Sequence, residues 1–185
     1  VFSLETLVNV DWEVTLGGPI VRDKLWFYVG TQYYRTQERP AGFPEDVDYK
    51  QPRIFAKLTS QLTPSLNMSV AFQATKYQGQ NRGAGSTTSP EACVTQDSPD
   101  WLASFTLTQI LSPETFFNIK TNYFEGRYYL DPEVGPDTYA HFDLNDNKLY
   151  DSAGYFGYYD RARFGTNASL THYAEDFLAG SHEFK

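Results

Sequence analysis

The sequence predicts an all-β protein in which about seven to eight antiparallel strands follow one another up and down in one sheet. Apolar and polar residues alternate with a period of two along most of the chain, as expected for strands whose two faces meet different surroundings. The connections between these segments are alternately short and long. Phe, Tyr and Trp make up 17% of the 185 residues, which is too many for a disordered chain.

The clearest strand is expected at residues 66–75. There Val70 and Phe72 fall on one face, whereas Ser69 and Gln73 fall on the other. The segments at 25–36 and 116–129 alternate less regularly but are rich in Tyr and Phe, which favour strands. In chain order, the predicted strands are residues 11–20, 25–36, 53–62, 66–75, 101–111, 116–129, 161–172 and one that begins near Ser181.

Tight turns are expected at residues 21–24, 63–65 and 112–115, and long polar segments at 38–52, 80–100 and 131–160. Pro64 and Pro113 favour the turns because the proline ring presets φ near about −65°. In an up-and-down sheet this order places every tight turn at one end and every long loop at the other.

These features together predict part of an outer-membrane β-barrel, with short periplasmic turns and long extracellular loops. The strands of about 10–14 residues exceed the usual length of about 5–6 in soluble sheets. Lipid offers no hydrogen bonds, so backbone groups must pair within the sheet while side chains sort by solvent. Aromatic residues near strand ends fit the girdles at the two membrane surfaces.

Two alternatives stay open. One is a complete small barrel of about eight strands that serves as an adhesin or membrane anchor. The other is a soluble all-β carbohydrate-binding module, because soluble strands alternate in the same way. The chain starts at Val1 without an initiator Met and ends at Lys185 within a predicted strand. We therefore expect residues 1–185 to be a piece of a longer barrel rather than either alternative.

Composition excludes several classes of protein. With 15 Lys and Arg against 23 Asp and Glu, the net charge is −8, which argues against non-specific nucleic-acid binding. No apolar run approaches the length of a transmembrane helix. The chain has one cysteine, Cys93, so it can form no internal disulfide and no cysteine-based zinc site. Pairing of Cys93 with a cysteine elsewhere and a free thiol both stay open.

No catalytic residues are expected. His141, His172 and His182 are scattered, and the sequence contains no metalloprotease or serine-hydrolase motif. The acidic residues concentrate in the predicted loops, where a solvated surface explains them. The sequence therefore predicts that the protein is not an enzyme.

One loop has the spacing of a calcium site. Oxygen side chains stand at positions 1, 3, 5 and 9 of one short segment, and they are Asp143, Asn145, Asn147 and Asp151. The segment resembles calcium-binding repeats, although Lys148 replaces their glycine. Because Gly154 stands where a bidentate glutamate would complete the site, binding would be weak. The alternative is a solvated turn rich in Asp and Asn.

Three segments resemble TonB-dependent outer-membrane receptors, in the subgroup with a carboxypeptidase-regulatory-like N-terminal domain. Residues 16–28, LGGPIVRDKLWFY, are similar to an early hairpin of that barrel, which follows its plug domain. Residues 55–65 resemble the next hairpin, and residues 181–185, SHEFK, resemble a later strand. The resemblance implies active uptake of a large nutrient, such as a glycan, a peptide or a metal chelate. It also implies coupling to the TonB complex through a plug that lies outside residues 1–185.

In such receptors the extracellular loops and the lumen wall bind the ligand. The resemblance therefore implies that aromatic residues of the third long segment contact the nutrient, and we name Tyr155, Phe156, Tyr158 and Tyr159. These rings could stack on a sugar, a peptide or a chelate. The alternative is a loop that packs on itself. The remaining expected partner is outer-membrane lipid, with no nucleic acid.

Overall fold

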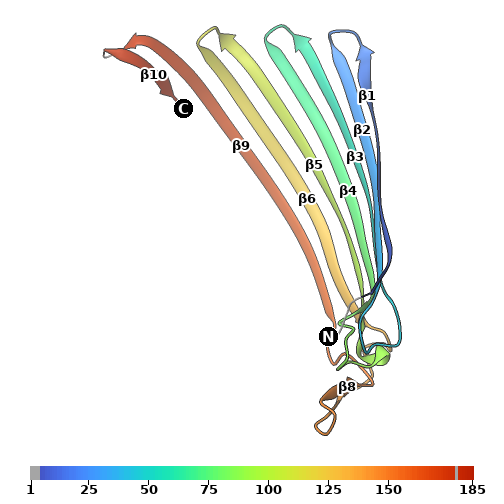
Figure 1. Cartoon of the computed structure of the whole chain (residues 1–185). Helices are drawn as coiled ribbons and strands as arrows, with labels where there is room; N and C mark the ends of the chain where they lie inside the picture. The colour runs from blue at the N-terminus through green and yellow to red at the C-terminus, as the bar shows by residue number, and fades with distance from the viewer. Residues whose placement is uncertain (1–4, 178) are drawn as a thin grey trace.

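A computed structural model of the chain describes residues 5–177 and 179–185. It contains one eight-stranded antiparallel sheet in which each strand pairs with the next, and a separate two-stranded hairpin (Figure 1). The sheet strands are β1 (Glu5–Val21), β2 (Leu25–Arg39), β3 (Val47–Thr63), β4 (Leu66–Arg82), β5 (Val94–Ser112), β6 (Thr115–Pro132), β9 (Gly157–Phe177) and β10 (Gly180–Phe184). The hairpin is β7 (His141–Asp143) with β8 (Lys148–Tyr150). The prediction of an all-β, antiparallel, up-and-down fold is confirmed.

The sheet is open. β1 pairs with β2 alone and β10 pairs with β9 alone, so the two edge strands lie at opposite ends of the sheet (Figure 1). One short helix, η1 (Pro90–Ala92), lies in a loop. Within residues 5–177 and 179–185, no helix is long and apolar enough to cross a membrane.

The tight turns lie at one end of the sheet and the long loops at the other, as predicted (Figure 1). In the first turn the backbone N–H of Lys24 donates to the carbonyl of Val21 at 3.1 Å. Before the two turn prolines, the hydroxyls of Thr63 and Ser112 each accept a backbone N–H two residues on, at 3.3 Å. These local bonds satisfy polar groups that the sheet leaves unpaired.

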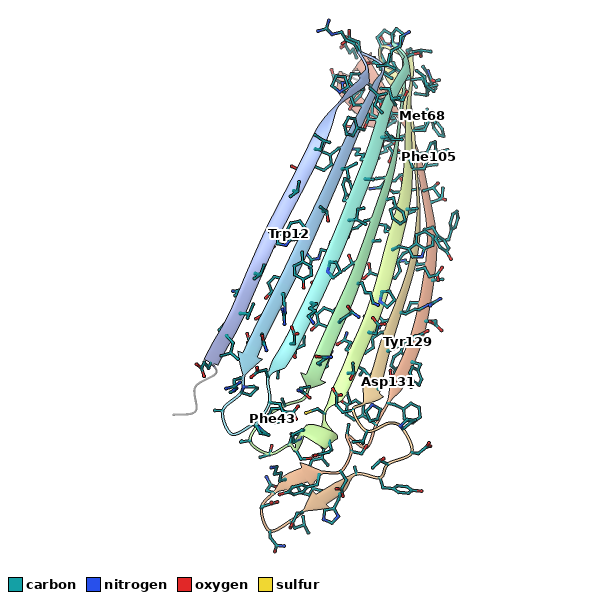
Figure 2. The ribbon with its side chains drawn as sticks, turned by 90° about the vertical axis from the view of Figure 1, so that its right-hand side faces the viewer. Trp12, Phe43, Met68, Phe105, Tyr129 and Asp131 are labelled. Carbon is teal, nitrogen blue, oxygen red and sulfur yellow. The ribbon has the colours of Figure 1, made fainter. Side chains whose placement is uncertain are left out.

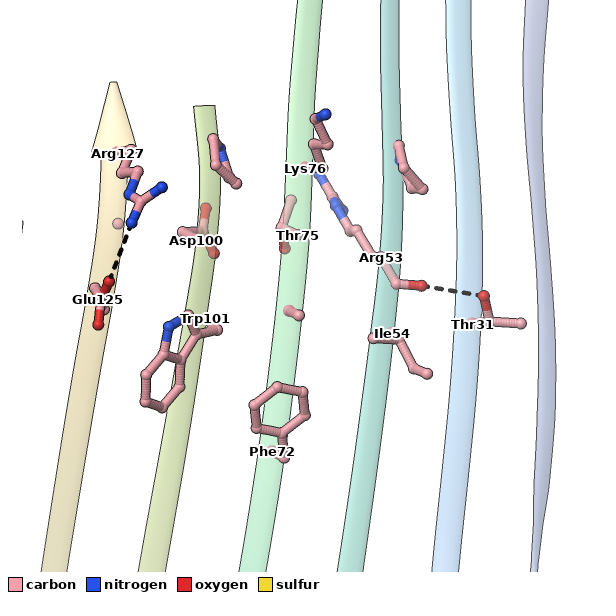
Figure 3. Close-up of a pocket in the computed structure, with 14 residues that line it drawn as sticks. Thr31, Arg53, Ile54, Phe72, Thr75, Lys76, Asp100, Trp101, Glu125 and Arg127 are labelled. Atoms are coloured by element: carbon pink, nitrogen blue, oxygen red, sulfur yellow. Dashed lines mark hydrogen bonds and ion pairs between the residues drawn. The ribbon is translucent and has the colours of Figure 1, made fainter. Parts of the chain in front are cut away.

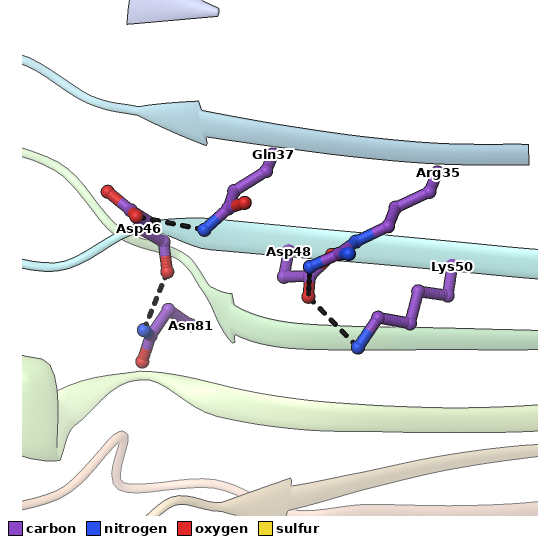
Figure 4. Close-up of polar contacts among 6 residues, drawn as sticks. All are labelled: Arg35, Gln37, Asp46, Asp48, Lys50 and Asn81. Carbon is purple, nitrogen blue, oxygen red and sulfur yellow. Dashed lines mark hydrogen bonds and ion pairs between the residues drawn. The ribbon is translucent and has the colours of Figure 1, made fainter. Parts of the chain in front are cut away.

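The predicted loop boundaries are wrong by several residues, because the strands extend into the polar segments. The loops span residues 40–46, 83–93 and 133–156. The strand ends look like loops in sequence because their side chains are charged. In the structure these charges pair across strands, and Arg35 binds Asp48 through two nitrogens at 3.0 Å each. Figure 4 shows this pair, and Lys50 beside it.

One face of the sheet carries an apolar band. The register places Val29 beside Ala56, Leu58 beside Val70, and Val70 beside Phe105. The band comprises Trp12, Val14, Leu16, Phe27, Val29, Ile54, Ala56, Leu58, Met68, Val70, Phe72, Ala74, Trp101, Ala103, Phe105, Leu107, Ile119, Tyr123, Phe164, Ala168 and Leu170. Several members of the band are about half exposed, such as Val70 at 50%. No second layer covers this face among the described residues (Figure 2).

The opposite face is polar. Its central residues carry mostly amides, hydroxyls and cations, and neutral examples are Gln32, Ser69, Gln73, Thr75, Ser104, Thr106, Asn118, Asn122 and Asn167. One set of paired residues on this face is apolar, namely Phe55, Leu102 and Phe124 beside Gln73. Elsewhere a one-residue step along a strand exchanges apolar for polar surroundings, which favours a single register.

The buried apolar core lies at the loop end instead of on the sheet. Its described members are Phe43, Val47, Ala92, Cys93, Val94, Leu130 and Ala153. These residues come from the three long loops and the strand ends beside them. The sheet itself is held mainly by its backbone ladder and by cross-strand side-chain pairs.

Candidate ligand-binding site

The three long loops pack on one another beyond the strand ends. The backbone N–H of Ser89 donates to the carbonyl of Leu149 at 2.9 Å, and the N–H of Leu149 donates to the carbonyl of Thr87 at 2.9 Å. The second loop thereby pairs with β8 of the third loop. Figure 2 shows the β7–β8 hairpin beyond the sheet, with Phe43 of the first loop close to the strand ends.

Asn81 links the first loop to the third. Its side-chain amide donates to the carbonyl of Asp46 at 2.9 Å and to Glu45 Oε2 at 3.1 Å. Its backbone N–H donates to Glu133 Oε1 at 3.2 Å. The backbone N–H of Glu133 donates to the carbonyl of Cys93 at 3.1 Å. All three loops therefore meet around Asn81 and Glu133.

Cys93 is fully buried in this loop cluster. Its thiol lies 3.7 Å from the carbonyl of Ser89. Burial raises the pKa of the Cys93 thiol to about 11, and the carboxylates of Glu133 and Glu45 act in the same direction. The thiol is therefore neutral at physiological pH and serves as a packing group.

The predicted calcium residues form a hairpin turn. Asp143 ends β7, and its Oδ1 accepts the backbone N–H of Asn145 at 2.8 Å and the side-chain amide of Asn145 at 2.9 Å. Asn147 occupies the left-handed region with φ of 57°, which asparagine tolerates well. These bonds match an Asp-rich turn, because they use the carboxylate oxygens internally.

Asp151 lies apart from Asp143. Lys148 pairs with Asp143 across the hairpin, whereas Asp151 follows the end of β8 and has a left-handed φ of 68°. In the described parts of the chain, no three His, Cys, Asp or Glu side chains gather as metal ligands. The structure thus links Asp143 to Asn145 by hydrogen bonds, whereas Asp151 lies outside the two paired strands of the hairpin. Calcium binding stays a prediction.

The four predicted aromatic residues do not share one loop. Tyr155 and Phe156 lie in the third loop, but Tyr158 and Tyr159 belong to β9, which begins at Gly157. Successive strand residues point to opposite faces, so Tyr158 pairs with Tyr129 whereas Tyr159 points to the polar face. The prediction of a single loop platform is corrected on this point, because the strand separates its members.

The polar face instead gathers an aromatic and cationic cluster that the sequence analysis missed. The Tyr128 and Tyr159 rings lie 6.2 Å apart. Two guanidinium groups lie over the Tyr128 ring, Arg82 at 5.8 Å and Arg161 at 5.7 Å from its centre. We call Tyr49, Tyr77, Arg82, Tyr128, Tyr159 and Arg161 the Tyr–Arg cluster, in which the Tyr49 and Tyr77 rings are 5.8 Å apart.

Neutral groups hold Arg82 in this cluster. Its guanidinium donates to the side-chain oxygen of Gln96, and the Gln96 amide donates to Ser98 Oγ at 2.9 Å. The guanidinium of Arg82 is therefore held in place by neutral groups that do not neutralise its charge. The alternation of β4, β6 and β9, continued past the predicted strand ends, would have placed Tyr77, Tyr128 and Tyr159 on one face.

Comparison with known proteins gives no further identification. No family model, curated protein or solved structure matches the chain. Its fold class therefore rests on the strand pairing, and its candidate site rests on the geometry of the polar face and the loop end.

Proposed function

We propose that this chain forms part of the wall of an outer-membrane β-barrel, in a receptor of the TonB-dependent kind that takes up a large nutrient. The observation that carries the proposal is the sidedness of the eight paired strands. One face carries an uncovered apolar band and the other a polar wall, which suits a sheet between lipid and a watery lumen.

The border of the apolar band nearest the long loops has the composition of a membrane surface. The Trp12 and Tyr33 rings stack at 6.1 Å on the β1–β2 pair, and Trp101 lies 5.1 Å from Tyr123 on β5–β6. Toward the loops, charged residues replace apolar ones on the same face, beginning with Lys76 on β4. Aromatic rings between lipid and charge are typical of barrel girdles.

The length of the band also fits a membrane. On β3 the uncharged stretch of the apolar face runs from Pro52 to Ser60, roughly nine residues, within reach of the 9–11 that a tilted spanning strand needs. An open sheet edge is unstable in lipid because its backbone groups find no partners. The proposal therefore places further strands beyond both β1 and β10.

The segments that resemble TonB-dependent receptors support the finer part of the proposal. Residues 16–28 form the β1–β2 hairpin and residues 55–65 the β3–β4 hairpin. A Cβ atom on Gly17 would lie 3.1 Å from the ring of Tyr28, so the strand pair needs a glycine there. In this proposal the protein is a transporter and not an enzyme.

Insertion into the outer membrane can be tested with two neighbouring lysine substitutions in the full-length protein. V70K places a charge at the centre of the apolar band, whereas S69K places it on the polar face one residue away. V70K should abolish assembly, because a lysine at the midplane costs about 2–4 kcal/mol. S69K should assemble normally, measured by heat-modifiable gel migration of isolated outer membranes. Equal assembly of both variants, or a protein found in the soluble fraction, would overturn the proposal and favour a soluble module.

A further inference from the structure

The sheet has a large open hollow on each face. The hollow on the apolar face has a volume of about 610 Å³ and lies above Phe72 and Trp101, below Lys76 and Arg127 (Figure 3). Two of its three cations face carboxylates, because Lys76 lies 3.6 Å from Asp97 and Arg127 lies close to acidic neighbours on both sides. The third cation, Arg53, is held by the amide oxygens of Gln32 and Gln51, so only one of the three lacks a carboxylate partner.

The hollow on the polar face differs in this respect. It has a volume of about 720 Å³ and is bordered by Leu102, Asn122, Phe124, Arg161, Arg163 and Gly165. No atom lies within 4 Å of the place where a side chain at Gly165 would begin, so the wall is open there. The hollow adjoins the Tyr–Arg cluster on the side of the tight turns, and Arg161 belongs to both.

Cations continue along this face from the loops toward the turns. We call Arg53, Lys57, Arg82, Lys120, Arg161 and Arg163 the cation track. Residues that lie side by side on neighbouring strands form a row across the sheet. Arg161 lies in the row of Asp100, and Arg163 lies in the next row of this face toward the tight turns. Lys120 lies two rows beyond Arg163 in the same direction. Each row lies about 7 Å from the next. The track therefore extends over much of the polar wall.

The cations of the track have few acidic neighbours in the described structure, although Arg53 interacts electrostatically with Asp100. None of its six residues forms an ion pair with a carboxylate whose side chain the structure describes. Arg53 is held by the amide oxygens of Gln32 at 3.0 Å and Gln51 at 2.6 Å. Between β3 and β9, Asp100 is the one acid that the described register places in these rows. On the same face of β1, Glu13 lies in the row of Arg53, and Asp11 accepts from the Gln32 amide at 2.8 Å. The basic part of the wall therefore runs from β3 to β9, in a chain with a net charge of −8.

We propose that the Tyr–Arg cluster and the cation track bind an acidic oligosaccharide, a chain of sugar rings that bears carboxylate or sulfate groups. This inference rests on the proposed function, because it assigns the polar face to the lumen. Guanidinium groups match carboxylate and sulfate with paired hydrogen bonds. Tyrosine rings provide flat surfaces on which sugar rings stack.

The spacing of the wall favours a glycan over other anions. The cations are spread over several rows, so they fit an extended ligand better than a compact metal chelate. Between them lie neutral hydroxyls and amides, including Ser104, Thr106, Asn122 and Asn167. Such groups form hydrogen bonds with the many hydroxyls of a sugar chain. An acidic peptide or a nucleic acid has fewer hydroxyls to offer them.

The test uses the full-length receptor purified in detergent, with binding measured by calorimetry. The probes are a short oligogalacturonate, its fully methyl-esterified form, a sulfated oligosaccharide, an oligoglutamate and a single-stranded oligonucleotide. At least one acidic sugar should bind, and which one binds separates carboxylate from sulfate recognition. If the carboxylated sugar binds, esterification should weaken it by about tenfold or more. The acidic sugar should bind more tightly than the oligoglutamate and the oligonucleotide.

Matched variants locate the site. R161Q and R163Q should each weaken binding of the acidic sugar by about tenfold, and R82Q should do the same. R127Q removes a cation from the other face of a neighbouring strand and should change affinity by less than about twofold. Because a variant that misfolds would be uninformative, each is compared only after heat-modifiable migration shows a folded barrel, and the arginines are tested singly for this reason.

The results that overturn the inference are distinct from those that overturn the proposed function. A folded membrane barrel that binds none of the acidic sugars contradicts this inference alone. So does equal binding of the esterified form, of the oligoglutamate or of the oligonucleotide, or an unchanged affinity in all three track variants. A full-length protein that never enters the membrane contradicts both.

Discussion

Asn81 and Glu133, which are 52 residues apart in sequence, are joined by a hydrogen bond of 3.2 Å that the backbone N–H of Asn81 donates to Glu133 Oε1. Further bonds of the Asn81 amide and of the Glu133 N–H connect this pair to the first and second loops. Asn81 adopts a left-handed conformation with φ of 55°, and this turns its amide toward the first loop (Figure 4). The pair therefore sets the position of the loop cluster beside the Tyr–Arg cluster, beyond the strand ends.

Replacement of Asn81 by alanine should loosen all three loops. The variant N81A loses two side-chain hydrogen bonds and strains a left-handed residue, at a cost of about 1–3 kcal/mol. The change should appear as faster hydrogen exchange in residues 40–46 and 133–156, with unchanged exchange at the strand centres. N81G keeps the conformation without the amide and should lie between N81A and the parent. Identical exchange in all three proteins would show that Asn81 does not hold the loops.

Two neighbouring glycines should respond differently to alanine. A Cβ at Gly17 would lie 3.2 Å from the carbonyl oxygen of Phe27, whereas one at Gly18 would lie 4.0 Å from its nearest neighbour. G17A should therefore destabilise the β1–β2 pair by about 1–3 kcal/mol. G18A should have little effect. Urea unfolding of the assembled protein checks this, and equal midpoints for the two variants would contradict the register of this pair.

The buried thiol predicts a loss of loop stability in alkali. The pKa of Cys93 rises from an ordinary value of 9.0 to about 11 in the folded chain, because burial disfavours the thiolate. The folded state then keeps its proton where the unfolded state has lost it. The contribution of Cys93 is intact below pH 9 and is lost as pH rises toward 11.

Hydrogen exchange of the loops between neutral and alkaline pH measures this effect. C93S, which cannot ionise, should remove the part of the alkaline loss that begins near pH 9. Alkylation of Cys93 by a maleimide should be slow at neutral pH, since the thiol is both buried and protonated. Rapid labelling of the folded protein at neutral pH would contradict this description.

The calcium prediction is tested by thermal melting of the loop region. If the sequence prediction holds, millimolar Ca²⁺ should raise the melting temperature, because binding only the folded state stabilises it. D143N should abolish that rise and leave the melting of the calcium-free protein nearly unchanged. No response to millimolar Ca²⁺ would leave Asp143 as a turn residue that bonds Asn145.

The strand pattern can be predicted because the face on which each residue of the apolar band lies follows from the alternation of its sequence neighbours. The alternation at residues 66–75 is sufficient to assign Val70 and Ser69 to opposite faces, and the structure agrees. Strand ends were less predictable. Arg35 and Asp48 look like loop residues until a cross-strand partner is known, and that partner is 13 residues away.

The candidate site shows the same limit. Tyr159 was singled out as a loop residue, but its ring faces Tyr128, and the strand between them is set by long-range pairing. Arg82 looked like part of a polar loop, although it lies over the same ring. The local sequence pattern therefore predicts one tyrosine of the cluster as a binding residue. The arginines can be assigned to the cluster only when the strand register is known.

The central claim, that the apolar band faces lipid and the polar face lines water, is tested most directly by cysteine labelling. V70C and S69C are made in the full-length C93S protein and labelled in isolated outer membranes. We predict that S69C reacts with a small water-soluble maleimide and V70C does not, while a lipid-soluble maleimide labels V70C. Equal labelling of both cysteines by the water-soluble reagent would contradict the account.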